Sequence, residues 1–129
     1  MKMLLDTHAL LWYVLDDVRL SAPARQVIDE LESRVLVSPA SYWEIAIKIS
    51  LKKYVLAAPY VVFWKCAIED NSFEILAIDV RHTEVLIGMP YRDHRDPFDR
   101  LMAAQALAEQ IAIVSADPRF EQYGVQRIW

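Results

Sequence analysis

Short apolar stretches alternate with longer amphipathic stretches along the whole chain. Five short apolar runs have the length and composition of buried strands, and they cover residues 3–5, 35–37, 73–78, 111–114 and 125–129. Helical spacing of apolar residues, often with Ser, Asp or Pro at the start, predicts helices over residues 9–15, 22–31, 39–52, 59–69, 80–87 and 97–110. Strands that alternate with helices over short turns predict an α/β sandwich around a mostly parallel sheet.

The length of the chain predicts a single domain. A chain of 129 residues buries about two thirds of its unfolded surface, which is enough for one core. We find no repeat or linker, and we therefore expect one domain over residues 1–129. No apolar run approaches the roughly 18 residues of a membrane span, and the acid Asp6 comes too early for a signal peptide. These features predict a cytoplasmic protein with no membrane partner.

The stretch from His94 to Ala104, HRDPFDRLMAA, carries the clearest chemical signal. Asp is a preferred N-cap and Pro is tolerated at the first helical position, so Asp96 and Pro97 predict the start of a helix. Asp99 then lies on the same turn and faces nearly the same way as Asp96. Capping explains Asp96, and a favourable charge at the helix N-terminus half explains Asp99. Other parts of the chain must decide whether the two acids belong to a site.

Three further acids stand at the end of a predicted strand or on the helix that follows one. Asp6 and Asp117 each come shortly after a predicted strand, and Glu44 lies on a helix among apolar neighbours. Each also has a structural explanation: Asp6 as a helix N-cap, Asp117 as the start of an Asp-Pro turn, and Glu44 as the partner of Lys48 one turn away. An acid buried among apolar residues needs a stronger partner than a surface lysine, and a metal ion is one.

In a parallel α/β sheet these acids are expected to meet at one edge, where the strands end. Carboxylates in one pocket resist joint ionisation unless a cation neutralises them. The ligands are hard oxygens with no zinc-type Cys or His cluster, so Mg²⁺ or Mn²⁺ is expected, in a site suited to phosphodiester hydrolysis. We assign Asp6 and Asp117 as metal ligands, Asp99 and Glu44 as ligands or as acids acting through a water, and Asp96 as an N-cap with an auxiliary role.

Composition qualifies what this site acts on. The net charge of −4 argues against a broad basic face for nucleic acid. Setting aside the five acids named above leaves 13 of the 18 acids against 14 Lys and Arg, so the remaining surface is about neutral. Lys48, Lys52 and Lys53 form either a solvated face or phosphate contacts near the site. The single cysteine, Cys66, excludes an internal disulfide, and its apolar helix predicts a buried thiol.

Four pieces of the sequence, LLDTHALLW, SPASYWEIAIK, HRDPFDRLMAAQAL and SADPRFEQYGVQRIW, extend in this order over nearly the whole chain. Together they resemble the PIN-domain toxins of the VapC type. The resemblance implies a PIN-like three-layer α/β/α sandwich, a homodimer, Mg²⁺- or Mn²⁺-dependent cleavage of RNA by an endoribonuclease, and inhibition by a cognate antitoxin. It places the acidic quartet of the family on Asp6, Glu44, Asp99 and Asp117, and a hydroxyl that helps to hold the site on Ser115.

Two alternatives stay open from the sequence. A receiver-like signalling domain also binds Mg²⁺ in an acidic pocket, but it uses paired acids near the end of its first strand, where this chain has Asp6 alone. The second alternative is a PIN nuclease outside any toxin–antitoxin pair. Residues 51–54, after the third helix, contain no glycine where the resemblance leads us to expect one, which leaves the shape of that loop open.

The remaining features predict structural roles or a partner surface. The simplest interpretation of the three histidines is a surface or capping role for His8, His82 and His94. A functional role is most favoured for His8 and His94, because they stand beside the acids. The helix over residues 59–69 spreads its apolar residues beyond one stripe. Part of its apolar surface, together with Trp12, is therefore expected to contact an antitoxin, and Trp64 is the residue whose replacement tests this.

Overall fold

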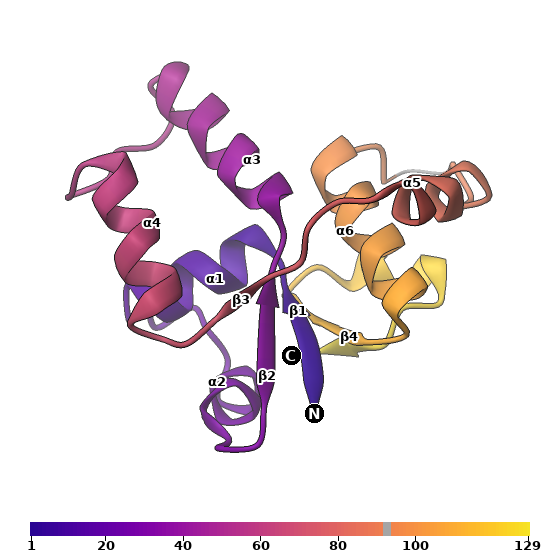
Figure 1. Ribbon diagram of the computed structural model, residues 1–129, viewed down its shortest axis with the longest axis horizontal. Coiled ribbons are helices and arrows are strands. Elements are labelled where there is room, and N and C mark those ends of the chain that lie inside the picture. Colours follow the sequence, from indigo (N-terminus) through magenta and orange to yellow (C-terminus); the bar gives the residue numbers. More distant parts are fainter. Residues whose placement is uncertain (92–93) are drawn as a thin grey trace.

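A computed structural model describes residues 1–91 and 94–129 of the chain (Figure 1). Five strands form one sheet in the order β3-β2-β1-β4-β5, and every pairing is parallel. The strands are β1 (Lys2–Leu5), β2 (Arg34–Val37), β3 (Glu74–Ile75), β4 (Ala112–Val114) and β5 (Arg127–Ile128). The predicted α/β sandwich around a mostly parallel sheet is confirmed.

The helices follow the strands as the sequence pattern predicts. They are α1 (Thr7–Val14), α2 (Ala22–Asp29), α3 (Pro39–Ser50), α4 (Tyr60–Glu69), α5 (Val80–Ile87) and α6 (Pro97–Glu109), with a short 3₁₀ helix η1 (Pro118–Tyr123). Ser21, Ser38, Asp79 and Asp96 each accept a backbone N–H at a helix start, as their residue types favour. Local capping chemistry therefore sets these boundaries.

The sheet separates two apolar cores because successive side chains of a strand point to opposite faces. Met3 and Leu5 of β1 pack with α1, α2 and α4 on one face. Leu4 and Leu36 pack with α5, α6 and η1 on the other. Figure 1 shows this three-layer arrangement, with α1, α2 and α4 on one side of the sheet and α5 and α6 on the other. Among the described residues, no helix is both long and apolar enough to cross a membrane.

Several predictions about single elements are wrong in detail. Only two residues pair in each of β3 and β5, because both strands lie at the edges of the sheet. Cys66 is exposed rather than buried, since it lies on the outer side of α4. Trp64 is buried together with Phe63 and Ala67 of that helix, and its ring lies edge-on against Tyr42 and Phe63. The aromatic ring that was expected to face a partner is therefore part of the core.

Candidate metal centre

The acids identified in the sequence come together at the carboxyl end of the sheet. Asp6 directly follows β1 and caps α1, and Asp117 follows β4 and caps η1. Because β1 and β4 pair, the backbone N–H of Asp6 donates to the carbonyl of Val114 at 3.1 Å, close to the start of the Asp117 turn. Asp6 therefore fulfils its expected capping role and still faces the site.

Two helices bring the remaining acids to the same end. Helix α3 continues from the tip of β2 (Figure 1) and carries Glu44, while α6 carries Asp99 in its first turn. The helices pack directly: the rings of Trp43 and Phe98 meet edge to face with their centroids 5.0 Å apart. Each acid thus stands beside the aromatic residue that joins the two helices.

Three side chains form the tightest group. Nε2 of His94 lies 2.9 Å from Oδ2 of Asp99 and 3.9 Å from Oδ2 of Asp117. One ligand atom from each of these residues lies within 4.8 Å of the other two, a spacing that suits a single metal ion. The structure therefore brings Asp99 and Asp117 together, but with His94 as the third member rather than Asp6.

Asp6 belongs to the same electrostatic environment. Burial raises the pKa of its carboxyl to about 7, against hydrogen bonds from the Ser115 hydroxyl and the Ala9 N–H that lower it. The charges of Asp99 and Glu44 raise this pKa further. The assignment of Asp6 as a metal ligand stays a prediction, supported by this mutual repulsion.

The pKa of Asp99 is also raised above its ordinary value. Burial raises its pKa to about 6, although the hydrogen bond with His94 lowers it, and the charges of Asp96 and Glu44 add to the increase. Two acids that resist ionisation in one place favour a nearby cation, because a cation stabilises their charged forms.

Asp117 has a different environment from the other two aspartates. Partial burial acts to raise its pKa, but the hydrogen bonds from Arg119 outweigh it and lower the pKa below its ordinary value. The Arg119 guanidinium donates to both carboxylate oxygens, from Nη2 to Oδ2 at 2.8 Å and from Nε to Oδ1 at 3.1 Å. Asp117 is therefore an ionised acid near neutral pH.

Glu44 carries an unsatisfied oxygen. Its side chain is buried, and Oε2 lies 3.3 Å from Nζ of Lys48, the one-turn partner that the sequence suggested. Among the described residues, its Oε1 has no hydrogen-bond partner. Because a buried carboxylate oxygen without a partner is costly, this atom fits a place for a cation or for a water bound to one.

A PIN domain family model matches residues 3–126. This chain belongs to the PIN domain family. It is 27% identical over 120 residues to Ribonuclease VapC22 of Mycobacterium tuberculosis (strain ATCC 25618 / H37Rv), covering 93% of this chain and 90% of that relative. The resemblance to PIN-domain toxins of the VapC type is thereby confirmed, in place of a receiver-like signalling domain.

Solved structures show the same PIN fold. The chain matches VapBC2 from Rickettsia felis bound to a DNA fragment from its promoter, with a TM-score of 0.67, 13% identity and full coverage of both chains. It also matches FitAcB from Neisseria gonorrhoeae, with a TM-score of 0.66 and 17% identity over 97% of this chain and 95% of that one. At these identities the likeness establishes the fold.

The auxiliary residues predicted in this PIN domain have clear local roles. The Oγ of buried Ser115 accepts the backbone N–H of Asp117 at 3.0 Å, while its hydroxyl also bonds Asp6. Ser115 thus links two acids of the centre. Asp96 is exposed, and its Oδ1 accepts the backbone N–H groups of Phe98 and Asp99 at 2.9 Å each. Its observed contacts are those of an N-cap.

The sequence pointed to a functional role for His94 but did not predict its burial or its contact with Asp99. His94 is fully buried rather than at the surface, stacked on Tyr123 and edge-on to Phe120. The hydroxyl of Tyr123 donates to the backbone carbonyl of His94 at 2.9 Å. In the sequence, only its position two residues before Asp96 indicated this role. The rings that pack against it, Phe120 and Tyr123, belong to η1 and lie far along the chain.

The residues present fit a divalent cation. Carboxylate oxygens suit Mg²⁺ and Mn²⁺, and an imidazole nitrogen suits transition metals such as Mn²⁺ better than Mg²⁺. Burial is the main cause of the raised pKa values of Asp6 and Asp99, and the nearby cations Arg119 and Lys48 pair with Asp117 and Glu44 instead. A cation beside Asp6 and Asp99 would stabilise their charged forms.

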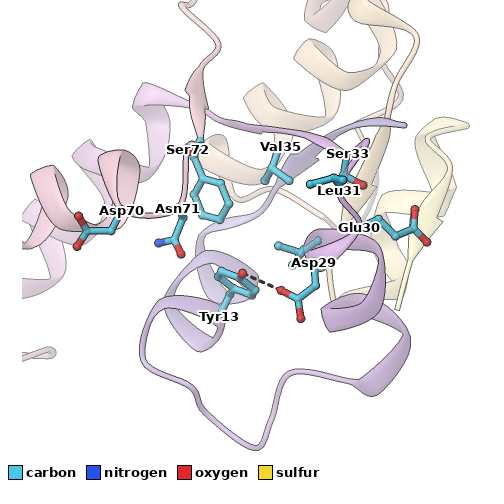
Figure 2. Close-up of a pocket in the computed structure, with 11 residues that line it drawn as sticks. Tyr13, Asp29, Glu30, Leu31, Ser33, Val35, Asp70, Asn71 and Ser72 are labelled. Atoms are coloured by element: carbon cyan, nitrogen blue, oxygen red, sulfur yellow. Dashed lines mark hydrogen bonds between the residues drawn. The ribbon is translucent and has the colours of Figure 1, made fainter.

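A separate cavity of about 330 Å³ lies beside the start of β2, away from these acids (Figure 2). Its wall contains Tyr13, whose hydroxyl donates to Oδ1 of Asp29 at 2.8 Å. Burial and this acid raise the pKa of Tyr13 to about 12, so its phenol stays protonated. Because the residues around it precede strands rather than follow them, the cavity faces the opposite edge of the sheet from the metal centre.

Proposed function

We propose that this chain is a divalent-metal-dependent endoribonuclease that hydrolyses RNA phosphodiester bonds, and that it is the toxin of a type II toxin–antitoxin pair. The observation that carries the proposal is the convergence of Asp6, Glu44, Asp99 and Asp117 at one end of a PIN domain. The 27% identity to a protein named as a ribonuclease supports the reaction class.

Mg²⁺ or Mn²⁺ is the proposed cofactor. Asp99, Asp117 and Asp6 would hold it, with His94 either fixing Asp99 or adding a ligand atom. When bound, such an ion lowers the pKa of water and stabilises negative charge on the phosphoryl oxygens.

The residues around the ion have separate tasks in this proposal. Ser115 holds Asp6 and the turn at Asp117 in one relative position through its two hydrogen bonds. Oε1 of Glu44, which has no hydrogen-bond partner in the part of the chain that the structure describes, would take the proton from the attacking water. Asp96 keeps the first turn of α6 in place and thereby orients Asp99.

The proposed partners follow from the relatives. The resemblance to VapC-type toxins, together with the match to the structures of VapBC2 and FitAcB, supports the assignment of a cognate antitoxin to this chain. We also propose that the chain forms a homodimer, and sedimentation analysis of the purified protein tests this directly. We expect it to act in the cytoplasm. A PIN nuclease outside any such pair is the remaining alternative, and it predicts no inhibition by a product of the neighbouring reading frame.

The decisive experiment is RNA cleavage by the purified protein with Mg²⁺, with Mn²⁺ and with excess chelator. We expect cleavage that depends on the metal and that Asp99→Asn or Asp6→Asn abolishes without loss of helical circular dichroism. Asp79→Asn is the matched control, because Asp79 is an exposed cap of α5 outside the acidic cluster. Undiminished cleavage in chelator, or in both site variants, would refute the proposal.

A further inference from the structure

A second cavity adjoins the candidate metal centre. Its volume is about 270 Å³, and its wall is built by α1, α3 and the segments that follow them. The side chains that give it its chemistry are His8, Trp12, Arg19, Lys48, Lys53 and Tyr54. This volume is close to the lower end of the range for small-ligand pockets.

The cavity and the metal centre share their walls. Lys48 lines the cavity and lies 3.3 Å from the carboxylate of Glu44. His8 lines it from the first turn of α1, two residues after Asp6. The cavity therefore lies next to the acids of the metal centre, with Lys48 and His8 between them.

The cavity combines flat rings with positive charge. The guanidinium of Arg19 lies 5.1 Å from the centre of the Trp12 ring, and the His8 ring lies 5.6 Å from it. Arg19 also pairs with Asp17, and Lys48 with Glu44. In the described part of the chain, no ion pair engages the exposed Lys53, and no acid lines the cavity.

This combination is typical of surfaces that bind single-stranded nucleic acid. Proteins bind such strands with aromatic or guanidinium planes that stack on bases and with cations that follow the phosphates. An acidic peptide would use the cations but would leave the Trp12 surface without a role. In a chain of net charge −4, a local group of cations beside an acidic centre also gives a phosphate backbone a favourable path.

We propose that this cavity binds a nucleotide of the RNA adjacent to the scissile phosphate, with its base against Trp12 and Arg19 and its phosphate against Lys53. The inference rests on the proposed ribonuclease function and adds to it the surface that positions the strand. Lys48 then lies between the two sites, paired with Glu44 and next to the bound backbone.

The test is binding of a fluorescently labelled, mixed-sequence single-stranded oligoribonucleotide, measured by fluorescence anisotropy in the Asp99→Asn background with Mg²⁺, so that the RNA stays intact. Trp12→Leu should weaken binding about tenfold or more, whereas Trp12→Phe retains most of the affinity because it keeps a stacking surface. Lys53→Gln should weaken binding and lower the slope of log K against log salt by about 0.7. Lys65→Gln, an exposed lysine of α4 outside the cavity, should change neither.

Two results would overturn the inference. One is RNA binding by Trp12→Leu and Lys53→Gln that equals that of the parent; the other is a loss of antitoxin binding in these variants with RNA binding intact, which would assign the cavity to the protein partner. Trp12 packs against Trp129, so its variants are checked by thermal unfolding, and the exposed Lys53 decides the question if Trp12→Leu fails to fold. Wild-type protein that cleaves no RNA would refute the nuclease proposal, while the binding series still decides the role of the cavity.

Discussion

Nε2 of His94 lies 2.9 Å from Oδ2 of Asp99, and the ring that makes this contact is entirely buried. Tyr123 stacks on the imidazole, and Phe120 closes its edge. Since the ring cannot move without disturbing this packing, the contact fixes the orientation of the Asp99 carboxylate. His94 is therefore a positioning residue for the acid that the proposed mechanism needs.

Replacement of His94 is predicted to weaken metal binding. His94→Ala frees the Asp99 carboxylate, and loss of such an orienting partner typically costs about 10–100-fold in metal affinity. Isothermal titration calorimetry with Mn²⁺ measures this directly, without reference to activity. His94→Gln retains a polar group near Asp99 and should recover part of the affinity; equal Mn²⁺ affinity in wild type and His94→Ala would show that the histidine only fills space.

Metal-free protein is predicted to lose stability as the pH rises. The pKa of Asp6 is about 7 in the folded chain against an ordinary value of 3.8, so folding favours the protonated acid. Stability from this group is full below about pH 4 and is lost as the pH rises toward 7, by on the order of 4 kcal/mol. Asp6→Asn keeps an N-capping side chain and removes the charge.

In chelator, Asp6→Asn should therefore unfold at a higher temperature than wild type at pH 8, and the advantage should vanish near pH 4. Thermal denaturation followed by circular dichroism at both pH values measures the difference. Lower stability of Asp6→Asn at pH 8 would show that the buried carboxylate already has enough compensation without a cation.

Antitoxin binding is predicted to depend on the exposed side of α4. Val61 is 76% exposed and lines an apolar hollow of about 230 Å³ with Tyr42, Tyr60 and Trp64. A charge there opposes an apolar partner, so Val61→Asp should weaken neutralisation by the antitoxin and leave RNA cleavage unchanged. Val80→Asp, on the equally exposed surface of α5, is the matched control, and equal neutralisation of both variants would exclude this surface.

The sequence predicted the local elements of this fold because local interactions create them. Apolar periodicity marked the five strands and helices α1 to α6, though not η1, and Ser38 and Asp96 cap the helices that they were expected to begin. The position of Asp6 and Asp117 after strands also predicted that both acids stand at the same end of the sheet, since strands β1 and β4 are parallel neighbours.

Other features depended on packing between distant parts of the chain. Which side of α4 is buried could not be read from a helix that is apolar nearly all round, so Trp64 was expected at the surface and Cys66 in the core, and both predictions are wrong. The role of His94 likewise required Tyr123, which lies 29 residues further along.

By itself, the sequence determined the alternation of strands and helices and the acids that carry the proposed chemistry, because capping, periodicity and residue type act over a few neighbouring positions. Its four motifs carried the resemblance to the PIN domain family, which the family model bears out. Only the tertiary structure decided that a buried histidine joins Asp99 and Asp117, that Glu44 has a free oxygen, and that a ring-lined basic cavity adjoins them. Those properties are set by distances and solvent exclusion between segments that meet only when the sheet and its two layers of helices assemble.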